Sequence, residues 1–189
     1  MAKKSWTHIL WKTIKHDTMK KMVFAKDVKP YRRKEGSGKT MRPYSALLIA
    51  KHIISYEAEH NRPVSNLRLQ KLLYFVQALF FLSVGEPCFA DRIEAWDFGP
   101  VVPRIYHTYK RYGSMIIQDM GDCPADEISA DDCEKIDEML DACADKSTRT
   151  LVEITHRQKP WQDARGNPFS NEITQAAFRK AFPRVEQAR

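Results

Sequence analysis

Apolar side chains recur every three or four residues over most of the chain beyond position 45, which is the spacing of an amphipathic helix. Leu47, Ile49, Ala50, Ile53 and Ile54 predict a first helix over residues 46–60. A second helix is predicted over residues 66–84 by Leu69, Leu72, Leu73, Val76, Leu79 and Phe80. Each helix presents an apolar stripe that has to be buried in a core.

Residues that favour helix ends support these bounds. Ser45 and Ser65 precede the two helices and are preferred N-cap residues, and Gly85 follows the second, where a left-handed residue is favoured. Pro103 predicts the first turn of a third helix over residues 103–112, closed by Gly113. Three more helices are expected: one opened by Ser129 that buries Cys133, Ile136, Leu140 and Cys143; one over residues 147–157 that stops before Pro160; and one begun by Ser170 that buries Ile173, Ala177 and Phe178.

Between the second and third helices the pattern becomes that of a strand. Residues 92–96 alternate apolar and charged positions and predict a short strand, which residues 97–100 turn back. Residues 115–118 predict a second short strand. The fold class is therefore mainly α: a compact single-domain helical bundle of about six helices with a small two-stranded β element. Residues 1–43 are expected to be a basic extension and linker, residues 44–184 the domain, and residues 185–189 a tail.

Charge separates the extension from the domain. The net charge is +7, yet residues 1–40 hold 12 Lys or Arg against 3 Asp or Glu, so the basic character belongs to this tract. Residues 119–146 carry eleven Asp or Glu against two Lys. The two segments could attract each other or serve separate partners. Met41 directly precedes the predicted domain, so an internal start there stays open.

Several classes of function lack their sequence signals. No secretory signal or membrane span is present, which indicates a cytoplasmic protein with no membrane partner. Cys and His do not occur at metal-binding spacings, and Gly36-Ser-Gly-Lys-Thr40 has Arg33 where a phosphate-binding loop needs Gly. We expect no metal, no cofactor and no enzymatic activity.

The two helices around residues 61–65 also resemble a helix-turn-helix. Ser65, Asn66, Arg68 and Gln70 are types that contact phosphates and bases. Leu67, Leu69, Leu72 and Leu73, however, demand burial around most of the second helix, and residues 41–189 carry a net charge of −2. Structural packing is favoured there, while nucleic-acid binding through residues 1–40 stays possible without being favoured.

Two stretches resemble a known family when taken together. Residues 69–78 read LQKLLYFVQA, and residues 85–103 read GEPCFADRIEAWDFGPVVP, followed by Ile105, Tyr106, Tyr112 and Gly113. A third stretch, LVEITH at 151–156, precedes Pro160, Trp161 and Ala164. This order is similar to the Panacea domain, also called the SocA-type antitoxin domain and found in phage-associated GepA proteins. The resemblance covers about residues 44–182. It implies a mainly helical antitoxin encoded beside the gene of its toxin, and it leaves the toxin unidentified because family members pair with unrelated toxins.

The predicted function is accordingly neutralisation of a cognate toxin by direct protein–protein binding. The alternative is a DNA-binding regulator of its own operon that acts through the basic extension, and an enzyme acting on a small molecule is third. Twelve residues are the candidate toxin-binding set: Gln70, Tyr74, Gln77, Trp96, Asp97, Phe98, Pro100, Val101, Arg104, Tyr109, His156 and Trp161.

Three choices within this set stay open. The face formed by Gln70, Tyr74 and Gln77 lines a polar groove or forms an internal hydrogen-bond network. For Trp96 the core is favoured, and for Phe98 and Tyr109 the interface is favoured, because aromatic side chains lose little entropy when they anchor a partner. His156 and Trp161 line the same groove or fill the core.

Overall fold

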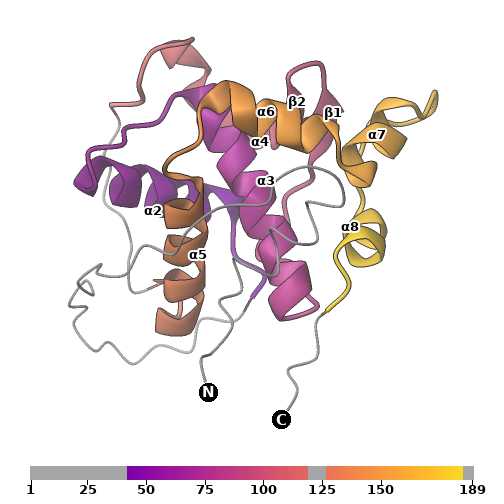
Figure 1. Ribbon diagram of the computed structural model, residues 1–189, viewed down its shortest axis with the longest axis horizontal. Coiled ribbons are helices and arrows are strands. Elements are labelled where there is room, and N and C mark those ends of the chain that lie inside the picture. The colour runs from indigo at the N-terminus through magenta and orange to yellow at the C-terminus, as the bar shows by residue number, and fades with distance from the viewer. Residues whose placement is uncertain (1–41, 119–126, 185–189) are drawn as a thin grey trace.

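The computed structural model describes residues 42–118 and 127–184. These ranges contain seven α-helices, one 3₁₀-helix and one two-stranded sheet (Figure 1). The elements are α2 (Ala46–Glu59), α3 (Asn66–Ser83), β1 (Glu94–Trp96), β2 (Gly99–Val101), α4 (Pro103–Tyr109), η1 (Lys110–Tyr112), α5 (Ala130–Cys143), α6 (Thr148–His156), α7 (Lys159–Arg165) and α8 (Gln175–Ala181). The mainly α fold class is therefore confirmed. The predictions about residues 1–41, Met41 and the tail at 185–189 lie outside the described residues.

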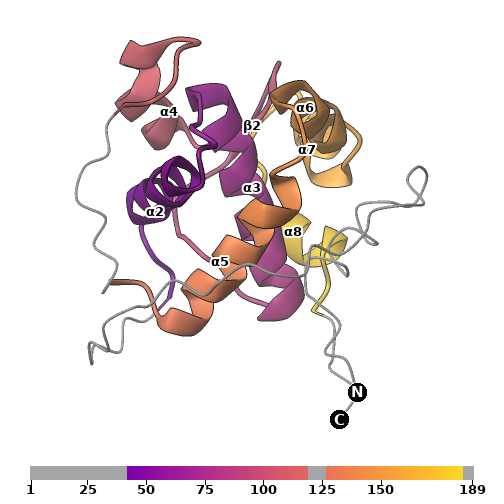
Figure 2. The same cartoon turned by 60° about the vertical axis from the view of Figure 1, so that its left-hand side comes forward.

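Helix α3 forms the centre of the fold. The Ser65 hydroxyl accepts a hydrogen bond from the Arg68 amide and so caps the helix, as predicted. Every residue from Leu69 to Leu82 is buried, and α2, α4, α5, α6, α8 and β2 all contact the helix (Figures 1 and 2). A helix that is apolar around most of its circumference is stable only when neighbours enclose it. One expectation is wrong here, because Leu67 is 37% exposed, on the side of the first turn that no neighbour covers.

Helix α5 packs its apolar face on α2 and α3 and turns its acidic face outward. Ser129 caps the helix, and the predicted core residues Cys133, Ile136, Leu140 and Cys143 are buried. Carboxylates at the edge of this face pair with α2 and the loop after it. Asp137 lies 2.6 Å from His52 Nε2, and Asp141 lies 2.9 Å from Arg62 Nη2. Acidic residues of α5 thus also attach it to α2 and to the loop after α2.

The β element differs from the prediction in its second strand. Glu94 pairs with Val101, Ala95 with Pro100 and Trp96 with Gly99, so residues 94–101 form a tight hairpin with Asp97 and Phe98 at its tip. Residues 115–118 contribute only one bridge, from Ile116 to Ser65. The cause is distance along the chain: two strands joined by two residues pair at once, whereas pairing 94–96 with 115–118 requires closing a longer loop.

The C-terminal helices also differ from the prediction. The helix predicted over residues 147–157 is α6, and it ends before Pro160 as expected. Pro160 also lies in the first turn of α7, a helix that was not predicted, where its missing N–H costs nothing. The described residues therefore form seven α-helices where about six were expected. Thr174, rather than Ser170, caps α8. Ile173 and Phe178 are buried as predicted, and Ala177 is half-buried.

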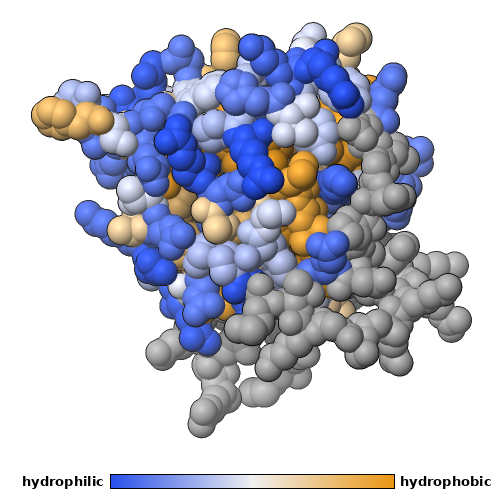
Figure 3. Space-filling model, turned by 180° about the vertical axis from the view of Figure 1, so that it is seen from behind, coloured by the Kyte–Doolittle hydropathy of each residue, from blue (hydrophilic) through white to orange (hydrophobic). Residues whose placement is uncertain are grey.

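No helix in the described part of the chain is long and apolar enough to cross a membrane. Figure 3 shows that polar side chains cover most of the back face of the molecule, with an apolar area visible between them.

Candidate functional site

The hairpin is fixed to α3 by buried polar side chains. Gln70 accepts a hydrogen bond from the Val102 amide at 2.9 Å and donates to Asn66 at 2.9 Å. Asn66 in turn donates to the carbonyl of Tyr106 at 3.1 Å. Because buried polar groups are costly unless they are hydrogen-bonded, these contacts define one position for the start of α4 relative to α3.

Lys71 lies directly beneath the hairpin. Its side chain is fully buried, and Nζ donates to the carbonyl oxygen of Pro100 at 2.7 Å. Burial lowers the pKa of Lys71 to about 7, because a charged ammonium loses its hydration there. Gly99 has φ of +95°, and a Cβ at this position would lie 2.8 Å from both Lys71 Nζ and Thr155 Oγ1. Only glycine allows the hairpin to lie this close to α3 and α6.

Gln77 and Tyr74 also face the interior. Gln77 accepts hydrogen bonds from the amides of Cys88 and Phe89 and donates to the Phe89 carbonyl, at 3.0, 3.2 and 3.1 Å. Tyr74 is buried against Phe178, with ring centroids 5.3 Å apart. The face of Gln70, Tyr74 and Gln77 is thus internal: two of its residues hydrogen-bond neighbouring backbone, and the third packs on α8.

Two tryptophans join the hairpin to α6 and α7. Trp161 Nε1 donates to the Trp96 carbonyl at 3.1 Å, and Trp96 Nε1 donates to the Glu94 carboxylate at 2.7 Å. Trp161 stacks on His156 with ring centroids 4.1 Å apart. Partial burial, together with the nearby charge of Lys71, lowers the pKa of His156. Trp96, His156 and Trp161 are all half-buried, so each has one side in the core and one toward solvent.

The remaining predicted residues divide into buried and exposed groups. Phe98 is 70% exposed at the hairpin tip, and Asp97 beside it forms an ion pair with Arg165 of α7. Arg104 is exposed and lies 3.4 Å from Asp91. Pro100 and Val101 are buried, and so is Tyr109, at 2% exposure. Tyr109 was expected at the surface, but α4 turns its side chain into the core.

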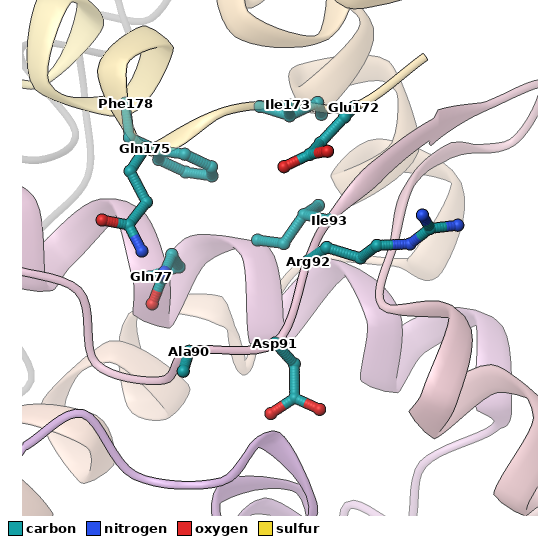
Figure 4. A pocket seen from close by; sticks show the side chains of 9 residues that line it. All are labelled: Gln77, Ala90, Asp91, Arg92, Ile93, Glu172, Ile173, Gln175 and Phe178. Carbon is teal, nitrogen blue, oxygen red and sulfur yellow. The ribbon is translucent and has the colours of Figure 1, made fainter. Parts of the chain in front are cut away.

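Two pockets in the described part of the chain lie away from the hairpin tip. The first has a volume of about 70 Å³ and lies between α3, the segment just before β1 and the start of α8 (Figure 4). The second is more open, has a volume of about 660 Å³ and is lined by Arg111, Tyr112, Ser114, Met115, Ile116 and Gln118. Clefts for small-molecule ligands usually enclose roughly 300–1,000 Å³, so the first is too small for such a ligand and the second is of that size. The described residues also contain no group of three His, Cys, Asp or Glu side chains that could hold a metal ion.

The helix-turn-helix interpretation finds no support in α3. The four residues proposed to contact DNA have partners inside the fold: Ser65 caps α3, Asn66 and Gln70 hold α4, and Arg68 donates to the carbonyls of Lys146 and Cys143 at 2.6 and 3.0 Å. None of these side chains is available to read a base edge.

Sequence reasoning missed two residues. Lys71 lies between the predicted core residues of α3. Because lysine is rarely fully buried, a lysine among core positions could have marked it as unusual. Phe169 is 94% exposed in the loop between α7 and α8. In the sequence, Phe169 follows Asn167 and Pro168 and precedes Ser170, a composition that predicts only a loop. The neighbouring residues do not indicate which part of the fold this loop contacts.

The described residues form a helical domain with an exposed aromatic side chain at the tip of its hairpin. Comparison with known proteins shows that the model of the family described as "Antitoxin SocA-like, Panacea domain" matches residues 69–162, which include most of α3, the hairpin, α6 and the start of α7. Residues 69–162 therefore form a domain of this antitoxin family. The chain is also similar to Antitoxin SocA of Caulobacter vibrioides, with 39% identity over 72 residues. That match spans 38% of this chain and 38% of the relative. No solved structure is significantly similar to the chain.

Proposed function

We propose that this protein neutralises a cognate toxin in the cytoplasm by binding it directly through the hairpin tip, and that the toxin is encoded by the adjacent gene. The observation that carries the proposal is Phe98, a 70% exposed aromatic side chain on a hairpin within the residues that match the antitoxin family. Leaving a large apolar group in water is unfavourable, and a partner pocket removes that cost.

The backbone around Phe98 is ordered before any partner arrives. Three side chains form hydrogen bonds with the backbone on either side of Phe98. Lys71 donates to the Pro100 carbonyl and Trp161 to the Trp96 carbonyl. Gln70 accepts from the Val102 amide. A partner therefore does not have to order the hairpin, which saves part of the entropic cost of association. In this proposal Trp96, Asp97, Phe98, Arg104, His156 and Trp161 form the contact surface, and Gln70, Tyr74, Gln77, Pro100, Val101 and Tyr109 support it from inside.

Growth rescue followed by co-purification tests the proposal. The product of the adjacent gene is expressed alone and together with this protein, and the complex is then isolated in low and high salt. We expect the neighbour to be toxic alone, harmless in the pair, and recovered with the antitoxin at both salt concentrations, because an apolar contact is not screened. A harmless neighbour, or rescue without a complex, contradicts the proposal.

Phe98→Ala tests the contact itself. We expect affinity for the toxin to fall about ten-fold or more, with little change in melting temperature, because the side chain is mostly exposed in the free protein. Met115→Ala is the matched control, since Met115 is 67% exposed outside the hairpin. A large loss of melting temperature with intact affinity would place Phe98 in the fold and not in the interface.

The basic extension supports a second candidate function. Residues 1–40 carry 12 Lys or Arg against 3 Asp or Glu, a balance typical of nucleic-acid-binding arms. A regulator that acts through this arm would bind its own operator in low salt and release it as salt rises, because phosphate contacts displace counterions. Gel-shift assays over a salt series therefore separate this function from toxin binding.

A further inference from the structure

Phe169 is the most exposed large apolar side chain in the described part of the chain, at 94%. Single exposed apolar residues are common and need no explanation by themselves. The position of Phe169 is informative, however, because the loop that carries it is attached to the hairpin that carries Phe98.

Backbone contacts hold this loop along the outer edge of β1. The Ala95 amide donates to the Asn171 carbonyl at 2.7 Å, Glu94 forms an antiparallel bridge with Glu172, and the Ile173 amide donates to the Ile93 carbonyl at 2.8 Å. In an antiparallel pairing, residues before Asn171 run in the direction of residues after Ala95. Phe169 therefore lies toward the same end of β1 as the hairpin tip.

Helix α7 makes a second connection between the two loops. Arg165, at its end, forms an ion pair with Asp97, the neighbour of Phe98. Figures 1 and 2 both show α7 and the following loop on the same side of the molecule as the hairpin. The ion pair thus joins the hairpin tip to the end of α7 from which the loop of Phe169 starts.

The loop itself is ordered by local hydrogen bonds. Asn167 Oδ1 accepts from the Phe169 amide at 2.9 Å, and Ser170 Oγ accepts from the Glu172 amide at 3.2 Å. Phe169 is consequently displayed by a fixed backbone, as Phe98 is. Anchors that are ordered in advance cost less entropy when a partner binds.

We propose that Phe169 is a second aromatic anchor of the toxin-binding surface and that Phe98 and Phe169 enter two separate apolar pockets on one toxin. This inference rests on the proposed function. The Asp97–Arg165 pair next to Phe98 is already neutralised within the chain. The partner that fits this surface is therefore apolar at two points and needs no charge to compensate this pair.

Binding measurements with two single variants and one double variant test the second anchor. The probe is the purified product of the adjacent gene, titrated in low and high salt against the full-length chain and its Phe98→Ala, Phe169→Ala and double variants. We expect Phe169→Ala to weaken binding about ten-fold or more, and the double variant to lose roughly the product of the two single effects, because separate pockets act independently. The losses should be equal at both salt concentrations.

Two controls separate loss of contact from loss of fold. Melting temperature should be unchanged in Phe169→Ala, since this side chain is almost entirely in water. Met115→Ala removes an exposed apolar side chain elsewhere and should leave affinity unchanged. The inference is overturned if wild type binds and Phe98→Ala weakens binding while Phe169→Ala binds as wild type does. If wild type itself does not bind the probe, the proposed function fails first.

Discussion

At the scale of single residues, Lys71 shows most clearly how the fold changes the pKa of a side chain. Its ammonium is fully buried and hydrogen-bonds one carbonyl oxygen, that of Pro100. A lysine in water has a pKa of about 10.4, and burial lowers the pKa of Lys71 to about 7. Protonation of Lys71 is consequently coupled to stability of the folded state.

This coupling predicts how stability depends on pH. Between pH 7 and about 10, the unfolded chain holds a proton on Lys71 that the folded chain has released, so the free energy of unfolding rises with pH, by at most about 1.4 kcal/mol per unit. Below pH 7 both states are protonated, and the dependence from this group disappears. Urea unfolding of wild type and Lys71→Met at pH 6 to 8.5 measures the difference.

The matched control for this prediction is Lys110→Met, which removes an exposed lysine. Measurements stay at or below pH 8.5 because the buried thiols of Cys88 and Cys143 have raised pKa values and act in the opposite direction at higher pH. Equal pH slopes above pH 7 for wild type and Lys71→Met would show that Lys71 keeps its proton in the folded state.

At the scale of elements, the hairpin is defined by its contact with α3 and α6. Gly99→Ala introduces a Cβ 2.8 Å from Lys71 Nζ and Thr155 Oγ1 on a backbone with positive φ. Gly113 also has positive φ, at +55°, but nothing lies within 4 Å of a Cβ added there. We expect Gly99→Ala to be less stable than Gly113→Ala by about 1–3 kcal/mol, because only the former adds a steric clash. Chemical denaturation of both variants gives the comparison, and equal losses would mean that the backbone conformation alone matters.

The elements also show what short-range sequence signals can predict. The N-caps Ser45, Ser65 and Ser129 were correct, because a cap bonds an amide only two or three residues away. The helix before Pro160 ended as predicted, but α7, which has Pro160 in its first turn, was missed, because proline that ends one helix can also begin the next. The second strand was misplaced because apolar residues at 115–118 suit a strand but have no partner strand beside them.

At the scale of the whole molecule, the described residues form a core around α3. Helix α3 is enclosed by elements that all lie beyond Ser45. We therefore expect removal of residues 1–40 to preserve cooperative unfolding and toxin binding and to abolish any binding to DNA. Calorimetry, toxin titration and gel shifts on the shortened chain check the three parts. Loss of cooperative unfolding would show that the extension belongs to the folded domain.

The sequence by itself determined six of the seven α-helices in the described residues, most of their ends and the resemblance to the family, because apolar periodicity, caps and motifs all depend on residues close together in the chain. It also placed Phe98 at a turn, where exposure is expected. Tertiary structure alone decided that Gln70, Gln77 and Tyr109 face inward, that Lys71 is buried against the Pro100 carbonyl, and that Phe169 lies toward the hairpin tip. Each of these outcomes depends on which segment, distant in the sequence, packs against the side chain. Neighbouring residues in the sequence do not predict such long-range packing.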